Sequence, residues 1–307
     1  MRLTIIITTE ISRAKGNQPE IKMGWDSLNP KFQSVTELVF FSQIIYSLLG
    51  LEMSSVHALE VKNPKRDYPL ALLISVVIII VSLILASLAV AIVVPEKSLD
   101  NLTGIIQSFT LFSESFDIPW LGTLVAFAIL IGGIAAVSTW ILGPTKGLFA
   151  AASDGLLPSA LAKFNRYNVP VNMLILQGLI GTVLTLLYLL LPSIEATYFA
   201  LSQMAAQLSM IMYIILFLAT LKLRSLFPNR YRPFKIPGNR FCLRIVCGLG
   251  IMTCIAVILI GFIPPSSKID IGTGSLYEII ICVGILLFLT PVLFIHKNKA
   301  VSKRSTS

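Results

Sequence analysis

An apolar stretch of the sequence, YSLLGLEMSSVHALEV, contains Tyr46, Gly50 and Glu52, which together could form a site inside a membrane. An ionisable side chain within a membrane span costs roughly 2.5–3.5 kcal/mol on insertion scales, so Glu52 needs a compensating environment. Gly50 has the backbone freedom to interrupt a helix, which is tolerated at membrane depth where the freed backbone groups face a cavity. Interrupted helices of this kind form the binding sites of many transporters.

A structural explanation of Glu52 also remains open. The carboxylate could hydrogen-bond a neighbouring helix, or it could lie close enough to the membrane surface to be hydrated. The turn that follows, KNPKRDYP, contains Asn63-Pro64 and Tyr68-Pro69. Residues before proline are biased away from helix, so we expect one span to end here and the next to begin near Pro69.

The composition of the chain identifies the class of protein that must position these residues. Of 307 residues, 55% are hydrophobic and only 13% are charged. The mean hydropathy is +0.85, well above that of an ordinary soluble domain. The sequence therefore predicts an all-α membrane protein, because the apolar runs are continuous and lack the alternation of a β-barrel.

We looked for apolar runs of roughly 20 residues, the length of helix needed to cross a bilayer. The sequence predicts about seven such transmembrane helices. The third run is too long for one perpendicular span, and its Gly132-Gly133 and Gly143-Pro144 pairs favour a tilt, a kink or an extension. The predicted spans are 36–57, 69–94, 120–150, 170–191, 196–221, 243–263 and 275–295.

The distribution of charge predicts how these spans are oriented. Basic residues gather within 62–66, 146–166, 222–244 and 297–304, whereas Lys97 and Lys268 fall on the other side. Because cytoplasmic loops carry the excess of Lys and Arg, we expect the C-terminus to be cytoplasmic. The net charge of +9 is then explained by topology and contact with anionic lipid, and nucleic-acid binding is disfavoured.

The stretch LLGLEMSSVHALEVKNPKRDYPLALL resembles the sixth helix and following loop of the amino acid–polyamine–organocation transporters. Three further stretches match in the same order, and they agree best with the bacterial glutamate/GABA antiporter branch of that family. These are STWILGPTKGLFAAASDGLLPSALAKFNRYNVPV, FPNRYRPFKIPG and GFIPP. The resemblance covers about residues 23–300.

The resemblance implies a leucine-transporter-type fold of twelve helices, the first ten of which form two inverted repeats of five. The chain corresponds to helices six to twelve, that is, the second repeat plus two helices. We therefore expect residues 35–300 to form this transmembrane region. Residues 1–34 would be an extramembrane segment and remnant of a truncated upstream helix, and 301–307 a short basic cytoplasmic tail. A separate chain could supply helices one to five.

The resemblance also implies where substrate binds. In that branch the substrate lies between two broken helices, and the corresponding positions here are Tyr46, Gly50, Glu52, Trp140 and Tyr213. Two positions depart from the branch. Ala136 stands where the branch has a glutamate, and Ser209 stands where it has a second tyrosine.

We therefore expect a multi-pass transporter of the cell (inner) membrane, an antiporter that exchanges glutamate/GABA-like or related amino acids by alternating access. The alternative is an inactive or interaction-only half-transporter remnant. We expect no enzyme activity, because the sequence contains no HExxH, Gly-x-Ser-x-Gly or phosphate-binding glycine loop. Four cysteines without a paired CxxC and two histidines indicate no metal site, and no cofactor is expected.

Overall fold

The computed structural model describes residues 38–57, 61–93, 104–115, 117–167, 169–189, 191, 193–232, 236, 240–264 and 274–305. The predicted N-terminal segment 1–34 lies outside these residues. Within them the chain forms helices and turns and contains no strand, which confirms the all-α prediction. The chain divides into two compact units, one made of 1–31 and 61–144 and the other of 32–60 and 145–307.

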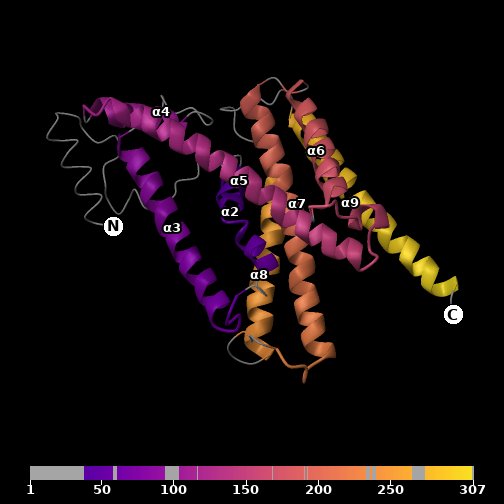
Figure 1. The fold of residues 1–307 in the computed structure, drawn as a ribbon. Coiled ribbons are helices and arrows are strands. Elements are labelled where there is room, and N and C mark those ends of the chain that lie inside the picture. Colours follow the sequence, from indigo (N-terminus) through magenta and orange to yellow (C-terminus); the bar gives the residue numbers. More distant parts are fainter. Residues whose placement is uncertain are drawn as a thin grey trace. The chain divides into compact units, whose positions relative to one another are not determined.

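The first unit contains α3 (Asp67–Val93), α4 (Gly104–Ser115) and α5 (Trp120–Ser153) as far as Pro144. Helix α3 begins with an acidic residue and carries Pro69 in its first turn, where the lack of a backbone N–H is harmless. It packs against α4 (Figure 1). Helix α4 was not predicted, because its 12 residues are too few for a membrane span, which needs roughly 20.

The second unit is built around one long helix, α7 (Ile194–Leu226), which packs against four other elements most extensively among the described residues. Its partners are α2 (Leu38–Ser47), η6 (Leu186–Leu189), α8 (Arg240–Gly261) and α9 (Gly274–Ser305). The remaining elements of this unit are η3 (Leu51–His57), the end of α5 from Thr145, η5 (Ser159–Ala162) and α6 (Val171–Thr185).

Both ends of α7 are capped by side chains. At the start, the Ser193 hydroxyl accepts a 3.0 Å hydrogen bond from the backbone N–H of Ala196, which satisfies one of the free donors of the first turn. At the end, the Arg232 guanidinium donates to the carbonyls of Leu223 and Phe227, at 3.2 and 2.9 Å. These contacts fix the length of the central helix.

Glycines allow the neighbouring helices to approach α7 closely. A Cβ atom at Gly250 of α8 would lie 2.6 Å from the Phe217 ring, and one at Gly284 of α9 would overlap the Met204 side chain. Small residues are the usual means of close helix packing in a membrane, where lipid tails compete for apolar contacts. The apolar core of this unit therefore gathers along α7.

The helices agree with the predicted spans in position. Among the described residues, five helices are long and apolar enough to cross a membrane: Asp67–Ala91, Trp120–Ser153, Val171–Leu189, Ile194–Leu226 and Arg240–Gly261. The last predicted span corresponds to a shorter apolar helix, Ser275–Thr290, within α9. The first predicted span corresponds to α2 and η3, which the chain does not join into one continuous helix.

Candidate functional site

The first predicted span is broken at Gly50, as its sequence indicated. Helix α2 ends at Ser47, and a 3-10 helix, η3, begins at Leu51. Gly50 lies between them with φ of +104°, in a region that residues with a Cβ rarely occupy. The prediction of an interrupted helix at this glycine is therefore confirmed.

Glu52 lies just after the break, where its carboxylate accepts a backbone hydrogen bond and lies near the Tyr213 hydroxyl. The backbone N–H of Gly50 donates to Glu52 Oε2 at 3.0 Å. The Tyr213 hydroxyl of α7 faces the same carboxylate as a side-chain hydrogen-bond partner. A carboxylate with these contacts and partial exposure is stabilised within an apolar unit, yet it can still bind a cationic group or a proton.

A second polar contact fixes α2 to α7 on the other side of the break. The Ser42 hydroxyl and the Gln43 side-chain amide both donate to Gln203 Oε1, at 2.7 and 2.8 Å. Ser42 and Gln203 are fully buried. Ser42 and Glu52, which take part in these two contacts, lie on opposite sides of Gly50 in the sequence, so the contacts with α7 bracket the break.

Apolar packing supports this alignment. Ile45 and Leu49 of the α2 segment, together with Tyr213, pack against a buried cluster of Met210, Cys254 and Val257. The cluster joins α7 to α8, and both helices contact α2. The position of Glu52 opposite Tyr213 is thus determined by packing as well as by hydrogen bonds.

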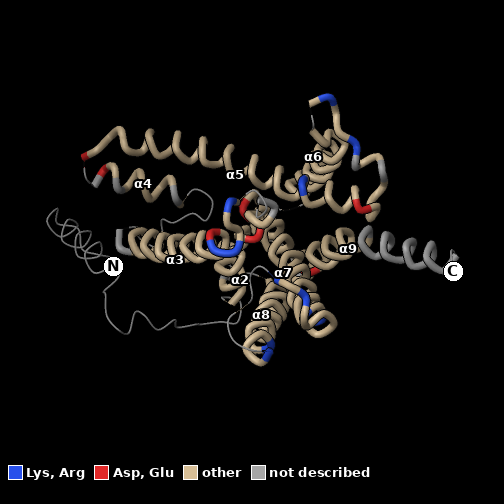
Figure 2. The backbone as a smooth tube through the Cα atoms, turned by 60° about the horizontal axis from the view of Figure 1, so that its bottom comes forward, with Lys and Arg blue, Asp and Glu red and all other residues tan. Residues whose placement is uncertain are grey.

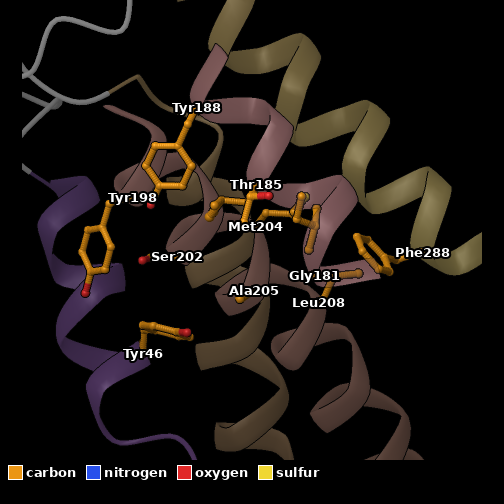
Figure 3. Close-up of a pocket in the computed structure, with 12 residues that line it drawn as sticks. Tyr46, Gly181, Thr185, Tyr188, Tyr198, Ser202, Met204, Ala205, Leu208 and Phe288 are labelled. Atoms are coloured by element: carbon orange, nitrogen blue, oxygen red, sulfur yellow. The ribbon is translucent and has the colours of Figure 1, made fainter. Parts of the chain in front are cut away.

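Tyr46, also predicted as a site residue, lies apart from this carboxylate. It lines a groove of about 550 Å³ together with residues of α6, η6, α7 and α9. Figure 3 shows Tyr46, Tyr188 and Tyr198 around Ser202 at one end of the groove. Neither Glu52 nor Tyr213 lines it.

Trp140 belongs to the other compact unit. It lies on the part of α5 that precedes Pro144, and its side chain is half exposed within that unit. Ala136 lies one turn earlier on the same helix. The structure therefore brings together Gly50, Glu52 and Tyr213, whereas Trp140 belongs to the other compact unit.

The sequence reasoning missed the glutamine pair on α7. Gln203 and Gln207 are fully buried, and Gln203 Nε2 and both polar atoms of the Gln207 amide have no hydrogen-bond partner in the structure. Both amides lie against Gly261 of α8. The available signal was the pair of glutamines at i and i+4 in an otherwise apolar span, since such residues usually face a neighbouring helix.

Long apolar helices around an interrupted segment, with an ionisable residue at the interruption, define a multi-pass membrane protein. The family model described as amino acid permease matches residues 1–288, and the chain belongs to this family. Its fold is therefore that of an all-α membrane transporter, and its helices have the composition and length expected for that class.

Several curated proteins are similar over most of the chain. An uncharacterised transporter of Legionella pneumophila is 44% identical over 88% of this chain and 58% of its own length. A glutamate/gamma-aminobutyrate antiporter of Lactococcus lactis is 32% identical over 89% of this chain and 54% of its own length. A probable agmatine/putrescine antiporter of Lactococcus lactis is 26% identical over 92% and 60%. The chain thus spans somewhat more than half the length of these relatives.

Proposed function

We propose that this chain contributes the second half of an amino acid antiporter, which exchanges glutamate, GABA or related amino acids by alternating access. Membership of the amino acid permease family supports amino acid transport. Two of the similar proteins are named as antiporters, one for glutamate and gamma-aminobutyrate and one for agmatine and putrescine. Exchange, and not one-way uptake, is therefore the mode we assign to this chain.

The observation that carries this proposal is the break at Gly50 with Glu52 facing Tyr213. A zwitterionic amino acid presents one ammonium and one carboxylate group. The Glu52 carboxylate can pair with the ammonium, and backbone groups at the break can bind the carboxylate, as in other broken-helix sites. We also propose Tyr46 and Trp140 as substrate contacts, each through its ring and the apolar part of the substrate.

We further propose that helices one to five are contributed by a separate chain or by sequence joined to this one. Alternating access in such folds is the movement of one repeat against another around a central site. The relatives are nearly twice as long as the segment they share with this chain, which supports a requirement for a second part. On this basis the chain inserts in the inner membrane with its C-terminus in the cytoplasm and does not transport alone.

The test compares the 307-residue chain with a fusion that carries the portion of the Legionella relative outside its matched 270 residues. Each protein is reconstituted in liposomes loaded with glutamate, and the exchange of external labelled glutamate, GABA, glutamine and arginine is measured. We expect saturable exchange by the fusion only. Exchange by the chain alone would refute the need for a second part, and no exchange by a folded fusion would favour an inactive or interaction-only protein.

The role of Glu52 is tested in the same fusion. Glu52→Gln removes the charge and keeps the shape of the side chain. We expect it to reduce exchange at least tenfold or to change its pH dependence, because a hydrogen bond to a charged group contributes about 1.5–3 kcal/mol. Glu278→Gln is the matched control, because Glu278 is exposed near the start of α9. Equal and small effects at both positions would leave Glu52 with a structural role only.

A further inference from the structure

Three arginines line a cavity of about 310 Å³ where α7 ends and α8 begins. Arg224 lies in the last turn of α7, Arg240 is the first residue of α8, and Arg244 follows one turn later. Figure 2 shows basic residues at these ends of the two helices. The lining is completed by Leu221, Ser225 and Leu243.

This cavity has no acidic residue nearby in the sequence. Between Glu195 and Asp270 the chain contains no Asp or Glu. Among the described residues, none of the three arginines forms an ion pair with a carboxylate, and their charges lie around one cavity. Like charges gathered in this way repel one another, so an anion bound among them would be strongly favoured.

A neighbouring arginine differs in its role. Arg232 donates to the carbonyls of Arg230, Leu223 and Phe227 and so caps the end of α7. A helix end explains the position of that side chain without any ligand. Within the described part of the chain, Arg224, Arg240 and Arg244 do not cap a helix in this way. Positive-inside topology alone does not require basic residues to share a cavity.

The chemistry of the lining matches a phosphate group. Guanidinium groups bind phosphate through paired hydrogen bonds, and the N-terminus of a 22-residue helix such as α8 adds backbone N–H donors. The Ser225 hydroxyl can donate one more hydrogen bond. Leu221 and Leu243 provide an apolar side to the same cavity, which suits the glycerol and first methylenes of a lipid better than a free ion.

We propose that this pocket, formed by Arg224, Arg240 and Arg244 with Ser225, Leu221 and Leu243, binds the phosphate headgroup of an anionic phospholipid. The pocket lies at the ends of two helices that are long and apolar enough to span a membrane, which is the level of lipid headgroups. A basic pocket between helices at this level is a suitable site for such lipids. The inference depends on the chain being a membrane protein and is independent of transport.

The test measures lipid binding to the purified 307-residue chain in phosphatidylcholine nanodiscs that contain increasing fractions of phosphatidylglycerol. Native mass spectrometry counts the retained phosphatidylglycerol, and thermal unfolding reports its effect on stability. We expect the triple variant Arg224→Gln, Arg240→Gln, Arg244→Gln to weaken retention of this lipid by roughly tenfold or more, because it removes all three guanidinium groups that would form paired hydrogen bonds with the phosphate.

A control variant removes the same charge elsewhere. Lys62→Gln, Lys163→Gln, Arg166→Gln alters three exposed basic residues outside the pocket, and we expect a change of less than about twofold in retention. Equal losses in the two variants would overturn the proposal in favour of general charge attraction. If the triple variant fails to fold, the single exposed substitution Arg240→Gln should still lower retention, and no change there would also contradict the site.

The source of the phosphate is distinguished by competition. We expect inorganic phosphate at millimolar concentration neither to displace phosphatidylglycerol nor to raise the unfolding temperature of the chain. If inorganic phosphate does both, the pocket is a site for the free anion and the lipid assignment is wrong. Equal retention of phosphatidylcholine and phosphatidylglycerol would likewise contradict it, because phosphatidylcholine carries no net charge.

Discussion

The side-chain oxygen of Gln203 accepts a 2.7 Å hydrogen bond from the Ser42 hydroxyl, although the two residues are 161 positions apart in the sequence. Glu52 and Tyr213 have the same separation and form a second polar contact between the same two segments. These contacts lie on opposite sides of Gly50. The broken segment is therefore tied to α7 both before and after its interruption.

Gln203→Leu tests whether this contact holds the broken segment. The substitution keeps a similar volume but removes the acceptor for Ser42 and Gln43. The Ser42 hydroxyl also donates to the Val39 carbonyl, so Ser42 keeps a partner, and we expect the free energy of unfolding to fall by about 0.5–1.5 kcal/mol for each hydrogen bond lost. Urea unfolding in micelles, followed by tryptophan fluorescence, measures the change. Ser209→Ala on the same helix is the control, because the Ser209 hydroxyl donates to the Ala205 carbonyl within α7 itself. Equal losses of stability in the two variants would argue against a special role for Gln203.

Gly50→Ala tests the conformation at the break. The φ of +104° at Gly50 is unfavourable for any residue with a Cβ, and we expect a loss of about 1–2 kcal/mol in stability. The Glu52 contact to the Gly50 N–H would also be disturbed. Thermal unfolding of the two proteins measures the effect. Gly178→Ala is the matched control, since Gly178 lies within α6 and a Cβ there would have no atom within 4 Å. We expect this control substitution to leave the stability unchanged or to raise it.

Gly261→Ala tests the packing of α8 on α7. A Cβ at Gly261 would overlap the side-chain amides of Gln203 and Gln207, which are fully buried. Overpacking of this kind costs typically about 1–3 kcal/mol. Gly248→Ala on the same helix meets open space and provides the control. Limited proteolysis of both variants measures the difference, and similar protection of the two would show that α8 does not approach α7 so closely.

Single cysteines at Asn101 and Asn229 test the predicted topology. In a background without the four native cysteines, we expect an impermeant thiol reagent to label these positions from opposite sides of the membrane. The expectation follows from the excess of basic residues near Asn229 and their scarcity near Asn101. Labelling of both cysteines from one side of sealed vesicles would contradict the orientation and the number of spans between them.

The sequence by itself determined the class of protein, the positions of the long apolar helices and the break at Gly50. Each of these follows from local properties: the length of an apolar run, and the backbone freedom of a glycine next to an ionisable residue. The resemblance of short stretches to a known family added Tyr213 and Trp140 as site candidates, which their own neighbours in the sequence did not indicate.

Only the tertiary structure decided which of these residues meet. Glu52 lies near Tyr213, and Ser42 hydrogen-bonds Gln203, because α2 packs against α7. Tyr46 turns instead toward the groove beside Tyr198. The arginine pocket exists because α7 and α8, separated by a loop, end and begin side by side. Such pairings are made between residues distant in the chain, so hydropathy and spacing carry no signal of them.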